Sequence, residues 1–288
     1  MINQKILSAY LELTKPRILT MVLVTTTLGF FLGGRGIHST PALLFLLLGV
    51  ALVCAGSAAL NHYLERDVDS KMARTRHRPL PTGIIQPADA LGFGIILILG
   101  GVFILWCKVN LLTAFLSLLS AFLYVLVYTP MKRISWLNTS IGAIPGALPP
   151  MGGWAAATGE VSLGAWVLFA ILFAWQHPHF YAIAWMFKED YQRGGLKMLP
   201  VVQPSGQATF LQIIVFSLLL IPISLLPAIL GISGNFYFWG ALVLGILMLG
   251  FGGILALSKS VADARKLLKA SVVYLPLLLL LIILDVKF

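Results

Sequence analysis

Charged residues are scarce in this chain. Asp, Glu, Lys and Arg make up 10% of its 288 residues, and 59% of the residues are hydrophobic. Soluble globular proteins carry about 25% charged residues. Only two cysteines are present, Cys54 and Cys107, and both lie inside apolar runs, which excludes a disulfide framework and a cysteine-ligated metal cluster. These shortages exclude a soluble domain and predict a polytopic, all-α membrane protein.

The sequence also shows no recognisable targeting segment and no linker between domains. No cleavable signal peptide is evident, and the first sixteen residues contain Glu12 and too little arginine for an organelle transit sequence. This favours a bacterial plasma (inner) membrane. No linker or low-complexity tract divides the chain, so we expect one domain over residues 1–288. The formal charge of +10 indicates cations retained on the cytoplasmic side, and we expect no nucleic-acid partner.

Long apolar runs set the expected architecture. A membrane span takes about 20 residues, and nine segments qualify. Their approximate bounds are 18–33, 42–64, 88–106, 111–128, 136–157, 163–187, 208–230, 236–257 and 271–286. The fifth segment contains Pro145, Pro149 and Pro150, so we expect it to be kinked or broken. Gly142 and Gly146 in the same segment have the spacing that allows close helix approach.

The distribution of cations supports nine spans with a cytoplasmic N-terminus. If every second loop is cytoplasmic, all lysines and arginines but three fall on that side. The exceptions are Arg35, Lys108 and Lys287. A wrong number of helices would have scrambled this alternation, since cytoplasmic loops concentrate Lys and Arg.

The most informative stretch follows the second span. Asn61, Glu65 and Asp69 are spaced four apart, which on a helix places them on one face with neighbouring Cβ atoms about 5–6 Å apart. One amide and two carboxylates provide the oxygen ligands that Mg²⁺ prefers. Asp67 falls off this face and is expected to be a paired surface charge. The stretch therefore predicts a magnesium site at a membrane surface.

Cations adjoin this predicted metal site. Arg74 and Arg78 follow at helical spacing and can bind phosphate bidentately. The other basic residues that we assign to diphosphate binding are Lys15, Arg17, Lys71, Lys132, Arg133 and Lys188. All of them fall on the predicted cytoplasmic side, where a site that opens to the cytoplasm would need them. Basic loops are also typical of ordinary topology, so the cations alone do not decide the question.

Two histidines lie inside the sixth predicted span. His177 and His179 flank Pro178, which opens the helix by removing a backbone hydrogen bond. Ionisable groups inside a membrane face a cavity or the bundle interior and are candidate functional residues. A neutral imidazole can ligate iron, whereas one of the two can instead hydrogen-bond the carbonyl that the proline leaves free. Further along the chain, Glu189 and Asp190 can form a second wall of a metal or diphosphate site, or a simple charged helix end.

These motifs resemble the UbiA superfamily of intramembrane prenyltransferases, and within it the branch that farnesylates haem. The resemblance covers nearly the whole chain. The matching stretches are 13–17 (LTKPR), Asn61 to Asp69, 72–80 (MARTRHRPL), 128–133 (YTPMKR), 141–150 (IGAIPGALPP), 178–180 (PHF), 190–191 (DY) and 198–201 (MLPV). One feature departs from the superfamily pattern. Two acidic residues four apart are usual after the sixth span, but Glu189 and Asp190 are adjacent here, which puts a second fully protein-ligated Mg²⁺ in doubt.

The resemblance implies farnesyl transfer from farnesyl diphosphate to haem B, with water completing a hydroxyethylfarnesyl product. It implies Mg²⁺ bound by Asn61, Glu65 and Asp69, with Asp190 as a further ligand, and haem held by His177 or His179. The catalytic residues that it implies are Asn61, Glu65, Asp69, Arg74, Arg78, Tyr128 and Lys132. Expected partners are membrane lipid and a downstream haem-modifying enzyme, haem A synthase, or a terminal oxidase.

Three other functions fit parts of the pattern. An enzyme that prenylates a quinone precursor would share the first acidic motif but not the Pro-His-Phe signature. A secondary transporter would place its buried charges near the bilayer midplane between repeats, whereas the acids here lie at span ends. A non-catalytic haem chaperone would explain the histidines but not Asn61, Glu65 and Asp69.

Overall fold

The computed structural model describes residues 4–287, which form helices joined by loops, with one isolated backbone bridge between Ser233 and Val286. The first half of the chain contains α1 (Gln4–Leu13), α2 (Pro16–Gly33), α3 (Thr40–Asp69), α4 (Pro87–Lys108), α5 (Leu111–Phe122), the π-helix η1 (Leu123–Tyr128) and α6 (Thr129–Ile134). The second half contains α7 (Asn138–Thr158), α8 (Leu163–Met186), α9 (Lys188–Arg193), α10 (Leu199–Val202), α11 (Gln207–Ile229), α12 (Asn235–Ser258) and α13 (Val261–Leu284).

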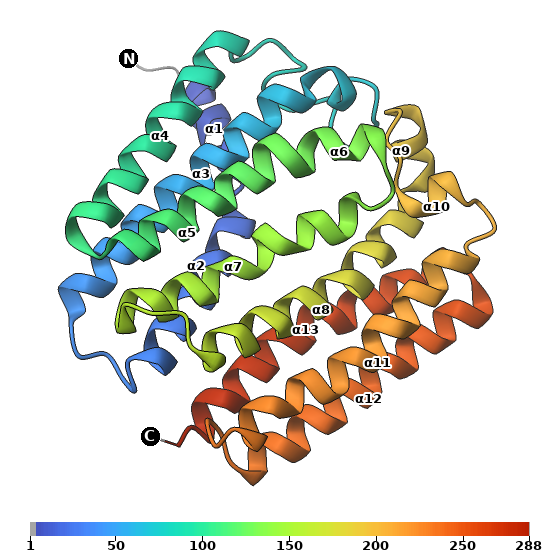
Figure 1. Cartoon of the computed structure of the whole chain (residues 1–288). Helices are drawn as coiled ribbons and strands as arrows, with labels where there is room; N and C mark the ends of the chain where they lie inside the picture. Colours follow the sequence, from blue (N-terminus) through green and yellow to red (C-terminus); the bar gives the residue numbers. More distant parts are fainter. Residues whose placement is uncertain (1–3, 288) are drawn as a thin grey trace.

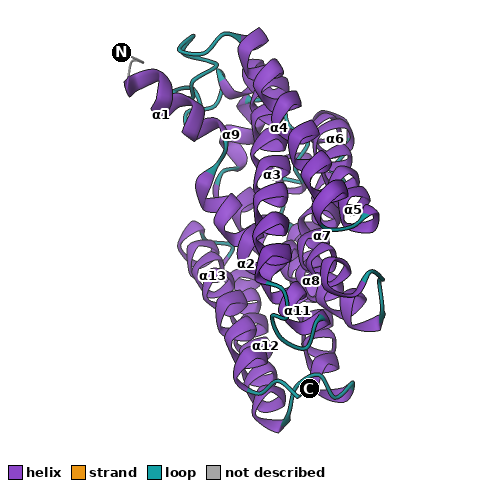
Figure 2. Cartoon of the chain, turned by 90° about the vertical axis from the view of Figure 1, so that its left-hand side faces the viewer, coloured by secondary structure: helices purple, strands orange, loops and turns teal. Residues whose placement is uncertain are grey.

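The long helices lie side by side in two groups. In the first group α3 packs along α4, α4 along α5, and α2 along both α3 and α7. In the second group α8, α11, α12 and α13 pack in a closed ring. Helix α7 joins the groups because it packs against α5, α2 and α8 (Figure 1). The view turned by 90° shows the same helices running along one axis, with the short helices α1 and α9 toward one end (Figure 2).

Among residues 4–287, eight helical segments are long and apolar enough to cross a membrane. They cover every predicted span except the fifth, which forms α7, a helix rich in Gly, Ala and Pro. The ninth predicted span is wrong at its start, because α13 begins at Val261 rather than near 271. Its first turns carry charged residues, so hydropathy alone misses them. Helix α3 likewise continues past its apolar run to Asp69.

Helix α7 is continuous despite three internal prolines, so of the two expected alternatives, a kink or a break, the break is absent. Pro149 has no N–H to donate to the carbonyl of Pro145, four residues earlier. Ser120 Oγ on α5 donates to that oxygen at 3.1 Å instead. A neighbouring helix thus satisfies a backbone group that a proline frees, as expected for a helix inside a membrane bundle.

Glycines set the closest helix contacts. A Cβ at Gly56 on α3 would lie 2.5 Å from the carbonyl oxygen of Gly94 on α4, and one at Gly101 would lie 2.5 Å from that of Gly49. On α7, Gly142 lies against the Tyr128 ring and Gly146 against the Gln176 side chain, at distances that leave no room for a Cβ. The predicted close approach at Gly142 and Gly146 is confirmed. Small residues let these helices pack without a hydrophobic driving force.

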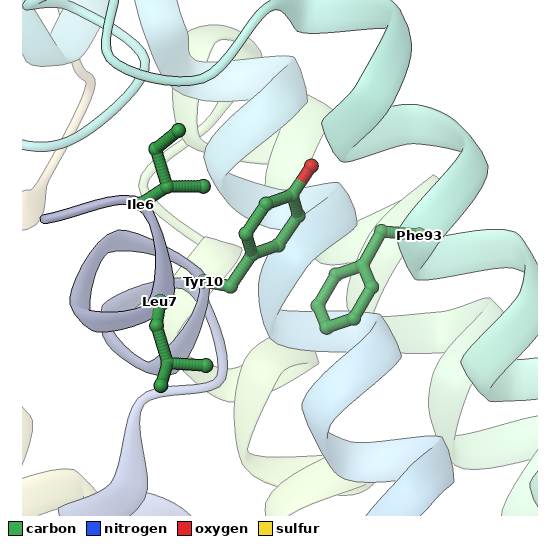
Figure 3. A pocket seen from close by; sticks show the side chains of 4 residues that line it. All are labelled: Ile6, Leu7, Tyr10 and Phe93. Atoms are coloured by element: carbon green, nitrogen blue, oxygen red, sulfur yellow. The ribbon is translucent and has the colours of Figure 1, made fainter. Parts of the chain in front are cut away.

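Helix α1 lies across one end of the first group. Ala9 and Leu13 are buried, whereas Ile6 and Leu7 are exposed. Tyr10 points toward Phe93 of α4, with 5.0 Å between ring centroids (Figure 3). This contact fixes the segment that leads into Lys15.

Candidate active site

The end of α3 presents the predicted oxygen donors on one face. Asn61, Glu65 and Asp69 are all buried, with 0%, 7% and 0% of their surfaces exposed. The helix is unbroken through all three, so their spacing places them one turn apart. Asp67 instead points away, and its carboxylate accepts a 2.7 Å hydrogen bond from Arg133 between two exposed side chains. The sequence-based placement of all four residues is confirmed.

Lys15 reaches the first of these donors. Its ammonium donates to Asn61 Oδ1 at 2.6 Å and to the Tyr124 hydroxyl at 3.4 Å. Asn61 Nδ2 in turn donates to Thr129 Oγ1 at 3.0 Å, which fixes the amide with its oxygen toward Lys15. Lys15 adopts a left-handed backbone conformation, with φ 50° and ψ 64°, just before α2. Such a conformation is uncommon for a non-glycine residue and directs the side chain to the site.

The pKa of Lys15 is lowered to about 7. Burial of the ammonium is the largest cause, and the positive charge of Arg78 adds to it. The carboxylate of Glu65 opposes the shift. Lys15 is therefore the site cation whose charge is most easily lost near neutral pH.

Lys132 reaches the second donor from α6. Its ammonium donates to Glu65 Oε1 at 2.7 Å and lies 4.5 Å from the centroid of the Tyr128 ring. The π-helix η1 directly precedes α6 and carries both Tyr124 and Tyr128, whose ring centroids are 5.6 Å apart. A π-helical turn of this kind re-aims side chains and is frequent at functional sites.

Arg78 reaches the third donor. Its Nη1 donates to both carboxylate oxygens of Asp69, at 2.9 and 2.8 Å. Thr75 Oγ1 donates to the backbone carbonyl of Asp69 at 3.0 Å, which holds the loop after α3 against the helix end. Each of the three donors therefore has its own cationic partner.

Asp190 anchors this loop from α9. Its two carboxylate oxygens accept hydrogen bonds from the backbone N–H groups of Ala73 and Arg74, at 3.1 and 3.3 Å, and Arg193 pairs with it as well. Burial pushes the pKa of Asp190 up, but the hydrogen bonds from Arg193, Ala73 and Arg74 outweigh it and hold the pKa below its usual value. Both oxygens are thus occupied by the loop, and the predicted metal role of Asp190 stays a prediction.

Arg74 lies near Asp190, in contact with two aromatic rings. Its guanidinium donates to the Tyr191 hydroxyl at 3.2 Å and lies 4.8 Å from the centroid of the Phe187 ring. Arg74 is otherwise exposed, so it lies at the rim of the site.

The structure separates the predicted diphosphate residues into two groups. Lys15, Arg78 and Lys132 meet at the oxygen donors, as described above. Four others lie apart: Arg17 and Lys71 are exposed, Arg133 pairs with Asp67, and Lys188 lies 4.6 Å from the Trp185 ring centroid. The direct assignment of these four to diphosphate stays a prediction.

The donor set fits Mg²⁺. It offers one amide oxygen and two carboxylates, and within residues 4–287 no hydrogen bond reaches Glu65 Oε2. Three separate cations contact these oxygens, which shows that the oxygens attract positive charge. Hard oxygen donors with further positions left for water and phosphate are what Mg²⁺ requires.

The two predicted haem-binding histidines differ in their surroundings. Both ring nitrogens of His177 have partners: Nδ1 lies 2.8 Å from the Phe173 carbonyl and Nε2 lies 3.0 Å from Ser140 Oγ. The ring also stacks on Phe216, with centroids 3.5 Å apart. These contacts describe a packed interior side chain.

His179 uses only one nitrogen. Its Nδ1 lies 2.8 Å from Ser271 Oγ on α13, and the ring stacks on Trp175. Among the described residues Nε2 has no hydrogen-bond partner, and the side chain is half-buried. A ring nitrogen oriented by its neighbour is typical of a histidine that ligates a metal. The geometry therefore favours His179 over His177 as the residue that could ligate haem iron.

Three further residues of the site lie in the matching motifs, but sequence reasoning gave them no role. Thr129 orients Asn61, Thr75 ties the loop to α3, and Tyr191 holds Arg74. Their partners lie on other helices or past a turn, so helical spacing gives no signal for them. Tyr124 was visible only as one of many aromatic residues.

Comparison with known proteins agrees with this geometry. The UbiA prenyltransferase family matches residues 22–275. A protein of Solibacter usitatus named protoheme IX farnesyltransferase is 47% identical over 96% of this chain and 98% of its own length. Proteins of the same name from Salinibacter ruber and Aquifex aeolicus are 44% and 39% identical, and each match covers at least 96% of this chain. The resemblance to the haem-farnesylating branch is confirmed.

Solved structures share the fold at low identity. A structure described under the biosynthesis of digeranylgeranylglyceryl phosphate synthase in membranes matches with a TM-score of 0.82 at 20% identity, over 98% of this chain and 99% of that one. A UbiA homologue from Archaeoglobus fulgidus bound to DMAPP and Mg²⁺ matches with a TM-score of 0.71 at 17% identity, over 95% and 98%. The fold, the site and the full-length relatives together place this chain in the UbiA prenyltransferase family.

Proposed function

We propose that this protein transfers the farnesyl group of farnesyl diphosphate to a vinyl group of haem B, with addition of water, giving haem O and diphosphate. Relatives named protoheme IX farnesyltransferase at 39–47% identity support the substrates. The observation that carries the chemistry is the pairing of three buried oxygen donors with three cations, within 2.9 Å in every case.

Lys15, Arg78 and Lys132 bind the diphosphate in this proposal. They stand where the bridging oxygen of farnesyl diphosphate gains negative charge as its bond to carbon breaks. Fixed cations at that position stabilise the departing group and need no rearrangement at the moment of reaction. Arg74 adds a rim contact, and Tyr128 holds the Lys132 ammonium in place from its ring face.

Asn61, Glu65 and Asp69 hold Mg²⁺, as the Archaeoglobus fulgidus homologue, which was solved with DMAPP and Mg²⁺, suggests by its fold. When bound, the metal supplies positive charge to the phosphate oxygens. With Mg²⁺ on these oxygens, Lys15, Arg78 and Lys132 would be free to bind the diphosphate. Asp190 acts through the loop that it anchors, because that loop carries both Arg74 and Arg78.

The farnesyl cation is captured by the haem vinyl group. Haem is held by His179, whose Nε2 is available and which lies in α8 about 10 Å below the helix end at 1.5 Å per residue. A bilayer suits this step, because both substrates are apolar and bulk water would quench the cation. The new bond to the farnesyl group forms at one vinyl carbon and leaves the other vinyl carbon cationic. One water adds to that cationic carbon and releases a proton to solvent, which gives the hydroxyl group.

The topology belongs to the same proposal. Residues 1–288 form one unit with nine spans in a bacterial plasma membrane. The eight apolar segments supply eight of them, and α7, fifth in order along the chain, is the remaining one. The N-terminus and the site face the cytoplasm, since the cations of the chain gather on that side. The product would pass to a haem-oxidising enzyme, haem A synthase, or to a terminal oxidase.

The test is an incubation of the purified protein in lipid with haem B, farnesyl diphosphate and Mg²⁺, with and without EDTA. Mass spectrometry of the extracted haem gives the result. A mass gain of one farnesyl group plus water that EDTA abolishes is expected. Unchanged haem from a folded protein would contradict the proposal and would favour a quinone precursor as acceptor.

A further inference from the structure

A fourth polar side chain shares the donor face of α3. His62 follows Asn61 and precedes Glu65 by three residues and Asp69 by seven. At 100° per residue, its direction is about 60° from Glu65 and about 20° from Asp69 around the helix axis. The imidazole therefore projects from the same side of α3 as the two carboxylates.

His62 has no partner for either ring nitrogen. The residue is 2% exposed, and both Nδ1 and Nε2 are buried without a hydrogen bond. It is the one side chain among residues 4–287 with two such atoms. A buried donor or acceptor without a partner is costly, and nearly all such groups in native proteins are satisfied. A bound molecule that completes the site would remove this cost.

The charges around His62 indicate what that molecule carries. Lys15, Lys132 and Arg78 contact Asn61, Glu65 and Asp69, which lie on the same side of α3 as His62. Three cations are therefore gathered on the side of the helix to which the imidazole points. A ligand that carries negative charge would be attracted to these cations, and an imidazole always presents at least one N–H to it.

A shared metal is a poorer explanation. Within the described part of the chain no three His, Cys, Asp or Glu side chains are grouped closely enough to hold one ion. Glu65 and Asp69 thus do not form a three-ligand set with His62. Mg²⁺ also prefers oxygen to imidazole nitrogen.

We propose that His62 is a diphosphate-binding residue, whose ring N–H donates to a phosphate oxygen of farnesyl diphosphate and of the diphosphate that leaves. This rests on the proposed function for the identity of the prenyl group. The part that concerns diphosphate rests on the two buried nitrogens without partners and on the three cations that gather on the same side of α3. The ring N–H of His62 thus gives the diphosphate an uncharged hydrogen-bond donor in addition to the cations Lys15, Arg78 and Lys132.

The experiment measures binding by the full-length protein in lipid nanodiscs with Mg²⁺ and without haem, so that no transfer occurs. The probes are inorganic diphosphate, farnesyl diphosphate and farnesol. The variants are His62→Leu, which removes both nitrogens, and His62→Gln, which keeps an N–H donor. Thr113→Val is the matched control, because Thr113 Oγ1 is also buried without a partner. Thr113 lies at the start of α5, and at 1.5 Å per residue about 28 Å of helix separates it from Lys132.

For His62→Leu we expect affinity for both diphosphates to fall about 10- to 100-fold, as for the loss of a hydrogen bond to a charged group. Affinity for farnesol should not change, and His62→Gln should recover most of the loss. Thermal unfolding of the ligand-free His62→Leu protein should occur at the same or a higher temperature, because two unsatisfied atoms are gone. Thr113→Val should leave all three affinities unchanged.

Two results would overturn the inference. One is diphosphate affinity that is unchanged in His62→Leu while the wild type binds diphosphate. The other is a lower unfolding temperature with an equal loss of farnesol affinity, which would show that His62 only supports the fold. A wild type that binds diphosphate but does not modify haem would contradict the proposed function. The diphosphate affinity of His62→Leu relative to wild type would then still decide the role of His62.

Discussion

Lys132 and Glu65 join α6 to α3 by an ion pair with 2.7 Å between Nζ and Oε1, and 13% and 9% of the two side chains are exposed. The pair lies between the Lys15–Asn61 and Arg78–Asp69 contacts. Three oxygen donors and three cations are therefore matched one to one. Lys132 and Arg78 neutralise the buried carboxylates of Glu65 and Asp69, and Lys15 donates a hydrogen bond to the buried amide oxygen of Asn61.

Glu65→Gln should reduce farnesyl transfer by about 10²- to 10³-fold, the usual cost of losing one electrostatic contact to a developing charge. The amide keeps the shape but not the charge that attracts Mg²⁺. Haem binding should be retained, because His179 lies on another helix. Turnover and haem absorbance, measured on the same samples, check this. Asp67→Asn is the control, since Asp67 pairs with Arg133 in solvent. Preserved transfer in Glu65→Gln would contradict the metal assignment.

Asp190→Asn should raise the KM for farnesyl diphosphate by about tenfold. The loop that carries Arg74 and Arg78 would lose two charge-assisted hydrogen bonds to its backbone. The Mg²⁺ concentration that gives half-maximal rate should stay unchanged, because both Asp190 oxygens hold the loop. Rates measured against each ligand in turn separate the two effects. A large shift in the Mg²⁺ requirement would instead establish Asp190 as a metal ligand.

His179→Ala should alter the absorption spectrum of bound haem, and His177→Ala should not. Nε2 of His179 is available, whereas both nitrogens of His177 are bound and its ring stacks on Phe216. We expect His177→Ala to lower the free energy of unfolding by about 2–4 kcal/mol, as for other truncations of packed interior rings. Identical haem spectra in wild type and His179→Ala would contradict a role for His179 at the iron.

The pH dependence of stability should carry the signature of Lys15. Its pKa in the folded protein is about 7, below the ordinary value of 10.5. The folded state therefore binds fewer protons than the unfolded state between these values, so stability rises with pH from about 7 to 10.5 and is lost as pH falls toward 7. The slope is at most about 1.4 kcal/mol per pH unit for one group. Unfolding of metal-free wild type and Lys15→Met across this range checks it, and parallel profiles would contradict it.

Gly153→Ala should destabilise the protein by about 1–3 kcal/mol, the usual cost of overpacking. A Cβ there would lie 2.0 Å from the Thr26 carbonyl oxygen, so α2 and α7 would have to move apart. Gly250→Ala is the control, because no atom lies within 4 Å of a Cβ at that position on α12. Thermal unfolding of both variants measures the difference. Equal unfolding temperatures would show that α2 and α7 are not packed as closely as described.

Local periodicity predicts the features that one helix decides. The spacing of Asn61, Glu65 and Asp69 gives a shared face, and that face forms because α3 continues to Asp69. The off-face position of Asp67 follows from the same rule. The apolar runs predict the long helices because burial in a membrane requires length, although charged first turns hide the true start of α13.

Local periodicity does not predict contacts between segments that lie far apart in the sequence. Asp190 lies 117 residues from Ala73, and no pattern in either segment indicates that a carboxylate caps that loop. Basic residues in cytoplasmic loops look alike in sequence, so Lys132 at the site and Lys188 beside Trp185 could not be separated. His62 was missed because its spacing to Asn61 carries no signal until the structure shows both nitrogens without partners.

The most direct test of the account is transfer carried out in water labelled with heavy oxygen, with wild type and Glu65→Gln compared at equal Mg²⁺. Mass spectrometry of the extracted haem gives both the farnesyl addition and the origin of the oxygen. We expect one farnesyl group and one labelled oxygen on each modified haem from wild type, and little or no modified haem from Glu65→Gln. Farnesylated haem in equal amounts from both proteins, or no farnesylated haem from a folded wild type, would contradict it.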